Sequence, residues 1–142
     1  MNTHETDFYS WTQEQLTLLK QGRYVEADIE HLIEELESMG ASERRELTNR
    51  LAVLLAHLLK WQYQPERRGN SWRFTIEEQR RKVARVLRQN PSLKPAIGEH
   101  LEDGYGDARL IAARETNLDK NAFPTECPWA VLQVLSDNFW PD

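Results

Sequence analysis

The chain has 142 residues and a net charge of −5, and its hydrophobic share of 39% and charged share of 29% suit a folded protein rather than a disordered one. No apolar run approaches the about 20 residues that cross a bilayer, and the first ten residues lack the basic and apolar segments of a signal peptide. Because Cys127 is the only cysteine, an internal disulfide and a zinc site of several thiolates are excluded. We therefore expect one domain over residues 1–142, in the cytoplasm and without membrane contact.

The net charge hides a strong asymmetry along the chain. Residues 1–40 carry two basic and nine acidic side chains, a net of −7, and residues 91–142 have a net of −5. Between them, residues 41–65 have a net of +2 and residues 66–90 a net of +5. Segments of opposite charge attract, so this pattern favours pairing between them, either within one subunit or across a dimer.

Apolar residues recur at helical spacing along nearly the whole chain, and no segment shows the strict alternation of a strand. The first helix is predicted over residues 7–21, with Asp7 as its cap and Gly22 stopping it. A second helix, with the cleanest apolar period, is predicted over residues 24–39. Gly40 is expected to end it.

The third predicted helix covers residues 42–63, with Ser42 as its cap. Its middle, residues 51–59, is apolar nearly all round, so we expect it to be the central helix, contacted on several sides. The polar segment PERRGNS at 65–71 predicts a loop, and Ser71 is expected to cap a fourth helix that ends near Gln89.

The last third of the chain predicts two or three further helices. Ser92 opens the fifth, whose first turn tolerates Pro95. Gly104 and Gly106 leave open whether residues 107–116 form a sixth helix or continue the fifth. Residues 128–135 read as a short last helix, and the aromatic residues after it are expected to dock onto the body. The fold class is therefore all-α, a compact bundle of six or seven helices around the central apolar helix.

The runs SERRELTNRLAVLLAHLLKWQYQPERR at 42–68 and SWRFTIEEQRRKVARVLRQNPSLKP at 71–95 are distinctive. Together with DFYSWTQEQ at 7–15, LIEELESMG at 32–40 and FPTECPWAVLQVLSDNFWP at 123–141, they resemble the bacterial domain-of-unknown-function 29 family. The resemblance covers nearly the whole chain and implies an all-α fold of bacterial origin. It implies no activity, cofactor or catalytic residue. The chain departs from the family pattern at Gly106, where the family has a proline near this position.

The four histidines are the natural candidates for metal binding or acid–base chemistry. His57 interrupts the central apolar run, so it is a candidate functional residue, although a structural histidine with one hydrogen-bond partner is the simpler interpretation. His31 and Glu34 resemble half of a di-iron site, but we expect this group to point to solvent. His4 lies in an expected frayed terminus, and His100 shows no partner pattern. Cys127 is expected to be a half-buried small apolar residue.

A basic segment provides the main candidate contact surface. Its members are Arg67, Arg68, Arg73, Arg80, Arg81, Lys82, Arg85 and Arg88. Clustered guanidinium groups suit carboxylates and phosphates because the planar fork donates two parallel hydrogen bonds. Glu77 and Glu78 stand four residues before Arg81 and Lys82, which predicts that part of this charge is internally paired.

Three interpretations of the basic segment remain open. It pairs with acidic residues of the same chain or of a second copy, it binds a separate protein, or it binds a nucleic-acid backbone. The sequence pI of about 5.4 is unusual for a dedicated nucleic-acid binder. We therefore expect a non-catalytic interaction module that needs no cofactor, with nucleic-acid binding as the alternative and an enzyme or metal site around His57 as the second alternative.

Overall fold

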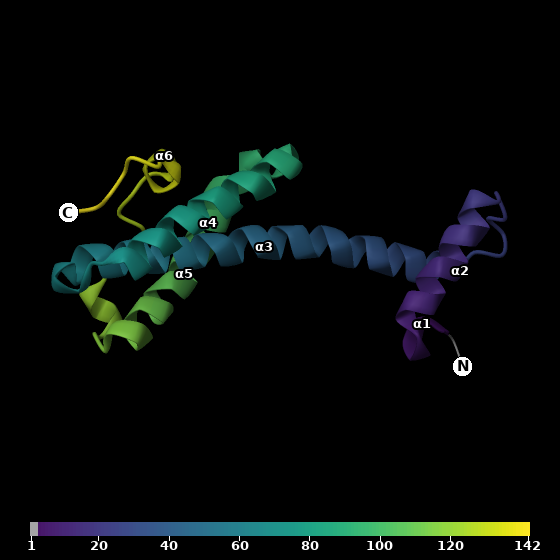
Figure 1. The fold of residues 1–142 in the computed structure, drawn as a ribbon, viewed down its shortest axis with the longest axis horizontal. Coiled ribbons are helices and arrows are strands. Elements are labelled where there is room, and N and C mark those ends of the chain that lie inside the picture. The colour runs from purple at the N-terminus through teal and green to yellow at the C-terminus, as the bar shows by residue number, and fades with distance from the viewer. Residues whose placement is uncertain (1–2) are drawn as a thin grey trace. The chain divides into compact units, whose positions relative to one another are not determined.

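The computed structural model describes residues 3–142, and this part of the chain contains helices and no strand (Figure 1). The α-helices are α1 Thr3–Thr6, α2 Phe8–Lys20, α3 Ile29–Tyr63, α4 Asn70–Gln89, α5 Ile97–Thr116 and α6 Val131–Leu135. Three short 3-10 helices connect them, η1 Pro65–Arg67, η2 Pro91–Ala96 and η3 Lys120–Ala122. The predicted all-α fold class is confirmed.

The chain divides into two compact units, residues 1–41 and residues 42–142. Helix α3 contributes its first turns to the first unit and its remainder to the second. That the two units form one domain stays a prediction. No helix in the described part of the chain combines the length and the apolar character needed to cross a membrane.

The core of the second unit lies along the apolar part of α3. Six of its leucines are completely buried, namely Leu47, Leu51, Leu54, Leu55, Leu58 and Leu59. Helices α4, α5 and α6 supply the opposite walls, with Ile76, Val83, Ala108 and Val134 all at zero exposure. The prediction of a central apolar helix at 51–59 is thus confirmed, because buried faces all round a helix require neighbours on several sides.

Helix α5 is continuous from Ile97 to Thr116, which settles the alternative that the sequence left open. Gly104 explains part of the close packing of α5 against α3. A Cβ atom at Gly104 would lie 3.2 Å from the backbone nitrogen of Ala52 and 3.2 Å from the carbonyl oxygen of Thr48. Gly106, in contrast, has open space around its Cα. Only the first of the two glycines is therefore needed for helix packing.

The predicted helix break at Gly40 is wrong, because α3 runs through this residue without interruption. Gly40 does not adopt the positive φ of a helix-ending glycine, whereas Gly22, with φ 72°, does and ends the turn after α2. A glycine inside a helix costs only about 1 kcal/mol relative to alanine. The helix-forming residues on both sides outweigh this cost, so Gly40 does not stop the helix.

The first unit consists of α1, α2 and the start of α3. Asp7 caps α2 as predicted, since its Oδ1 accepts a hydrogen bond from the backbone N–H of Ser10 at 3.0 Å. Trp11 is buried and donates from Nε1 to Oδ2 of Asp28 at 3.1 Å, while the Gln15 side chain accepts from the backbone N–H of Asp28 at 2.7 Å. These bonds hold α2 against the N-terminus of α3.

Candidate functional site

Arg80 of the predicted basic segment lies in the interior and not on the surface. Its side chain is only 3% exposed, and it donates from Nε to the carbonyl oxygen of Val134 at 2.9 Å and from Nη2 to that of Phe139 at 2.7 Å. The guanidinium also lies 5.5 Å from the ring centroid of Trp140. Arg80 therefore holds the C-terminal segment onto α4, and its interpretation as a surface contact residue is wrong.

The position of Arg80 follows from the spacing of α4. It stands four residues after Ile76 and three before Val83, both of which are fully buried, so it shares their inward face. Burial lowers the pKa of the guanidinium, while the charges of Asp137 and Glu77 oppose this change. An arginine remains protonated throughout the physiological range. The interior thus contains a charged group that backbone carbonyls and nearby carboxylates stabilise.

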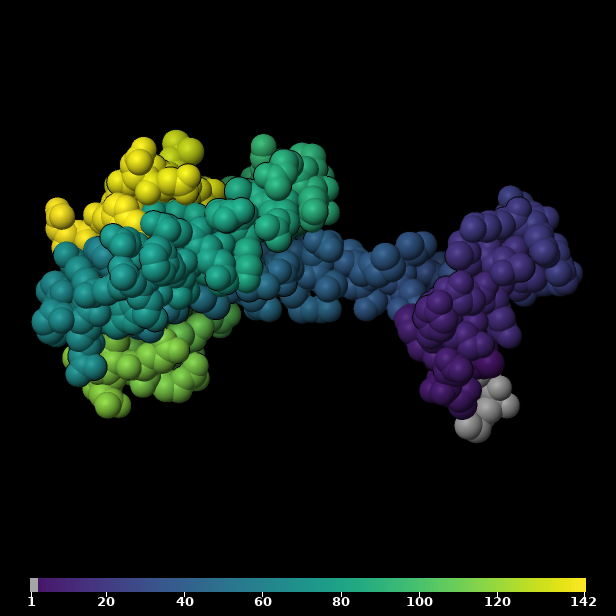
Figure 2. Space-filling model, viewed as in Figure 1, coloured from purple at the N-terminus to yellow at the C-terminus, as the bar shows by residue number. Residues whose placement is uncertain are grey.

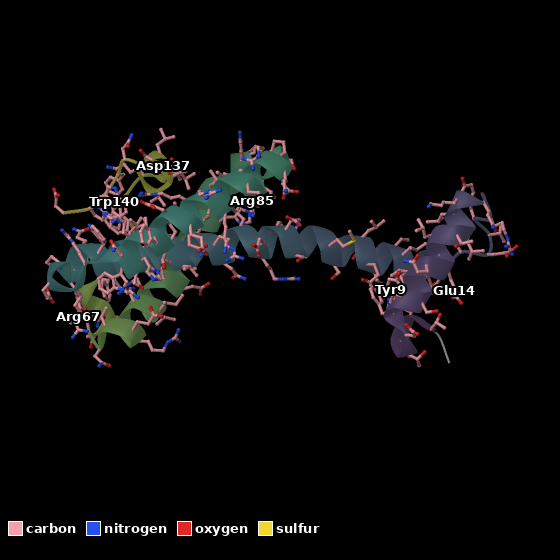
Figure 3. All side chains as sticks on the ribbon, in the orientation of Figure 1. Tyr9, Glu14, Arg67, Arg85, Asp137 and Trp140 are labelled. Atoms are coloured by element: carbon pink, nitrogen blue, oxygen red, sulfur yellow. The ribbon has the colours of Figure 1, made fainter. Side chains whose placement is uncertain are left out.

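Arg68 also has an internal role. Its Nε donates to the carbonyl oxygen of Trp61 at 2.6 Å, and its Nη2 donates to that of Pro141 at 3.3 Å. Its guanidinium lies 5.2 Å from the centroid of the Trp61 ring. Arg68 therefore joins the end of α3 to the C-terminal segment, and Figure 3 labels Trp140 in that segment.

The remaining basic residues of the segment are accessible. Arg67 is exposed on η1. On α4, four arginines are exposed and one lysine is half-buried, and we call this set the basic face: Arg73, Arg81, Lys82, Arg85 and Arg88. Its members recur at helical spacing on the side of α4 away from the core. Figure 2 shows the outer side of α4, in teal and green, uncovered on the visible side of the second unit, and Figure 3 labels Arg85 there.

Acidic side chains neutralise only part of the basic face. Lys82 pairs with Glu78 at 2.7 Å, as predicted, and this bond lowers the pKa of the Glu78 carboxyl. The predicted pair of Glu77 with Arg81 does not form among the residues that the structure describes. The exposed carboxylate of Glu77 nevertheless remains one turn from Arg81 on the same helix.

A shallow hollow of about 400 Å³ lies on the outer side of α4. It is lined by Phe74, Glu77, Glu78, Arg81, Lys82 and Arg85. Phe74 is 55% exposed, and the Arg73 guanidinium lies 5.4 Å from its ring centroid. The basic face therefore combines guanidinium donors with one accessible aromatic ring, a composition that is typical of recognition surfaces.

His57 has the structural environment that the simpler interpretation expects. Its ring is half-buried, and Nδ1 lies 2.9 Å from the carbonyl oxygen of Val53, so Nδ1 carries the proton and donates it. Burial and the positive charge of Lys60 lower the pKa of His57, whereas the bond to Val53 raises it. Lys60 is buried and donates to Glu115 at 2.7 Å. The imidazole is thus neutral near pH 7 and already has a partner.

His31 does not point to solvent as predicted. It is half-buried, its Nδ1 lies 2.7 Å from Oδ2 of Asp28, and its ring stacks on that of His4 at a centroid distance of 4.1 Å. His4, in turn, lies 2.8 Å from a carboxylate oxygen of Glu35. The expectation of a frayed terminus at His4 fails because α1 folds back onto α2. Within residues 3–142, no group of three or more His, Cys, Asp or Glu side chains is arranged to hold a metal ion.

The two other candidate groups have structural partners. His100 lies 2.9 Å from the hydroxyl oxygen of Thr48, which joins α5 to α3 across a sequence distance that no local pattern reveals. Cys127 is half-buried, as expected, and its thiol donates to the carbonyl oxygen of Trp129 at 3.4 Å. Burial raises the pKa of this thiol, which reduces the reactive thiolate fraction.

Residues 3–140 match the model of a protein family described as a domain of unknown function, DUF29. No curated protein and no solved structure gives a significant match. The resemblance that the sequence motifs indicated is therefore confirmed over nearly the whole chain. Because the description of the family assigns no activity, the role of each residue must be argued from the chain itself.

Proposed function

Since this chain belongs to the DUF29 family, whose description assigns no activity, we propose its function from its own surface: it is a non-catalytic interaction module that binds an acidic protein segment through the basic face of α4. The observation that supports this proposal is the separation of the arginines into two groups. Arg68 and Arg80 are engaged by backbone carbonyls, whereas Arg81, Arg85 and Arg88 are exposed.

The chemistry of the basic face favours a carboxylate-rich partner. A guanidinium forms two parallel hydrogen bonds with one carboxylate, and successive arginines at a spacing of three or four residues align along one side of a partner segment. The exposed ring of Phe74 adds an apolar contact beside these charges. Exposed side chains of this kind contribute through their number and alignment, since a single surface ion pair contributes about 0–1 kcal/mol.

The acidic partner segment is either part of another protein or the N-terminal segment of a second copy. Residues 1–40 have a net charge of −7, and opposite charges would steer such an encounter. The cytoplasm and a bacterial source remain part of this proposal as expectations.

Nucleic-acid binding is the alternative, and one observation favours it. An exposed aromatic ring among arginines can stack on an unpaired base. Two features oppose it, the carboxylates of Glu77 and Glu78 within the same hollow and the sequence pI of about 5.4. A catalytic or metal site around His57 has weaker support, because the described residues include no group of three or more His, Cys, Asp or Glu side chains arranged to hold a metal ion.

Charge reversal on α4 tests the proposal. The variant carries Arg81→Glu, Arg85→Glu and Arg88→Glu, and a control carries Arg44→Glu, Arg45→Glu and Arg114→Glu, three exposed arginines outside α4. Proteins retained from the source lysate at about 50 mM salt are compared by mass spectrometry. We expect at least one partner to be retained by the wild type and the control and lost by the α4 variant.

Equal retention by both variants would exclude the basic face as the binding surface. Oligonucleotide binding distinguishes a nucleic-acid partner from an acidic protein partner. The affinity for a nucleic acid falls steeply between about 50 and 200 mM salt, because it depends on phosphate contacts. Single-stranded and duplex probes that bind the wild type in this salt-dependent way, and not the α4 variant, would favour a nucleic-acid partner instead.

A further inference from the structure

The first unit has a small core and a large exposed apolar surface. Within its described residues, the buried side chains are those of Trp11, Gln15 and Ala27. Its exposed large apolar residues are Phe8, Tyr9, Leu16, Leu19, Tyr24, Val25, Ile29, Ile33, Leu36 and Met39. In the described part of the second unit, only Phe74, Leu110 and Leu132 belong to this class. An apolar surface of this extent is characteristic of an interaction site.

Five of these exposed residues line a groove between α2 and the start of α3, where α2 lies across the first turns of α3 (Figure 1), namely Phe8, Leu16, Leu19, Leu36 and Met39. The groove has a volume of about 400 Å³, and its apolar lining includes Trp11, Leu16, Leu19, Leu32, Leu36 and Met39. Glu35 is its one charged lining residue, and this carboxylate already lies 2.8 Å from Nε2 of His4. The groove therefore offers an occupant apolar contacts and almost no unpaired charge.

Apart from Glu35, the acidic side chains at the start of α3 lie away from the groove. Glu30 and Glu34 each stand two residues from Leu32, which corresponds to about half a turn of helix. Glu37 stands two residues from Met39 and is exposed in the same way. A basic partner helix would gain little from carboxylates on the far side. The distribution of charge thus favours an apolar occupant whose own charges also point outward.

The size of the apolar surface matches that of a stable dimer. Five of the exposed residues line the groove, and Tyr9, Ile29 and Ile33 lie on the same two helices, so that eight apolar side chains of α2 and the start of α3 are roughly half exposed. An aromatic side chain buries about 150–250 Å² and the six aliphatic ones bury less, so these eight, at half exposure, present on the order of 600 Å². Specific protein interfaces bury about 600–1,000 Å² on each partner. A second copy of the same surface would satisfy this requirement.

We propose that the occupant of the groove is a second copy of this chain, so that α2 and the start of α3 from two subunits form a four-helix core. The contact is isologous, with the same residues on both sides of a two-fold axis, which is the commonest symmetry of soluble oligomers. Two helices cannot bury an apolar face by themselves, whereas four helices enclose it. The outward carboxylates of both copies remain in water.

The interface has a distinct dependence on salt. Each copy brings a first segment with a net charge of −7, so the two segments repel each other at low ionic strength. Raising the salt concentration screens this repulsion, and the dimer is therefore equally stable or more stable at about 0.5 M than at 0.05 M sodium chloride. Association through the basic face of α4 would weaken under the same change.

Analytical ultracentrifugation of the full chain tests the proposal. The wild type should sediment as a particle of twice 16.7 kDa at micromolar concentration. Leu36→Glu replaces a groove residue that is 66% exposed, and it should raise the dimer dissociation constant at least about tenfold. Leu16→Gln, on the opposite helix, serves as a second, milder variant.

Val25→Glu is the matched control, since Val25 is fully exposed in the turn outside the groove and should leave the dimer unchanged. Circular dichroism confirms that each variant remains folded. The proposal would be overturned if the wild type remained a monomer at all concentrations up to about 100 µM. Its dimer dissociation constant would then be higher than that of most specific complexes. The proposal would also be overturned if Val25→Glu and Leu36→Glu raised the dimer dissociation constant equally, or if added salt dissociated the dimer. None of these outcomes affects the charge-reversal test of α4.

Discussion

Arg80 donates a hydrogen bond from Nε to the carbonyl oxygen of Val134 at 2.9 Å, across 54 residues of sequence. This bond joins α4 to α6 in the interior of the second unit. The neighbouring Arg81 is exposed on the outer side of the same helix. Two adjacent arginines thus have separate roles, one in stability and one in the proposed recognition.

Arg80→Met should destabilise the protein by about 2–4 kcal/mol, because it leaves the carbonyls of Val134 and Phe139 without their charged donor. Arg81→Met is the matched control and should change the free energy of unfolding by less than about 0.5 kcal/mol. Urea denaturation monitored by circular dichroism measures both values. Similar stability of the two variants would show that the interior bonds of Arg80 do not support the fold.

Gly104 and Gly106 of α5 should respond in opposite directions to substitution by alanine. Gly104→Ala should destabilise by about 1–3 kcal/mol, because the added methyl group meets backbone atoms of α3 at 3.2 Å that cannot move aside easily. Gly106→Ala should stabilise by up to about 1 kcal/mol, since its Cβ meets open space and alanine favours the helix. Thermal unfolding of the two variants measures the difference, and an equal effect would contradict the packing of α5 on α3.

Lys60 and Glu115 form an ion pair in which the lysine is buried and the carboxylate is partly exposed. Glu115→Gln should cost about 1–3 kcal/mol, because a buried ammonium loses its charged partner. The bond lowers the pKa of Glu115 below 4.5, so its contribution is present above pH 4.5 and is lost as the pH falls through the folded-state value. The difference in unfolding free energy between the wild type and Glu115→Gln should be smaller at pH 3 than at pH 7.

His31 should titrate above its ordinary pKa of 6.5, chiefly because its ring bonds to the carboxylate of Asp28. The charges of Glu34 and Glu5 act in the same direction, and the ring also stacks on His4. The raised pKa means that protonated His31 stabilises the folded state fully below pH 6.5, and that this stabilisation is lost as the pH rises through the folded-state value.

An NMR titration of the His31 ring protons between pH 5 and 9 measures this pKa directly. Asp28→Asn should return it toward 6.5, because the variant side chain carries no charge. A wild-type value at or below 6.5 would contradict the contact between the two side chains.

The sequence was sufficient to predict the central helix, because residues 51–59 are apolar on every face and only a surrounded helix explains that pattern. The inward position of Arg80 was also readable from its spacing to Ile76 and Val83, although its carbonyl partners, 54 and 59 residues away, were not. The continuity of α3 at Gly40 could not be predicted, because a glycine is compatible with both a helix end and a helix interior.

The apolar surface of the first unit illustrates a second limit of sequence reasoning. The spacing of Ile29, Ile33 and Leu36 predicts an amphipathic helix. Periodicity identifies an apolar face but not what covers it, and the structure leaves these side chains exposed within their unit. The same limit applies to His31, whose burial depends on the fold of α1 rather than on its own helix.

Recognition by the basic face of α4 can be measured by arginine-specific labelling of the protein, with and without the partner that the affinity comparison recovers. Phenylglyoxal modification is read by mass spectrometry at each arginine. We expect the partner to protect Arg81, Arg85 and Arg88. Exposed Arg44 and Arg114 should label equally in both states, and buried Arg80 should label in neither. Undiminished labelling of the three α4 arginines in the complex would contradict recognition by this face.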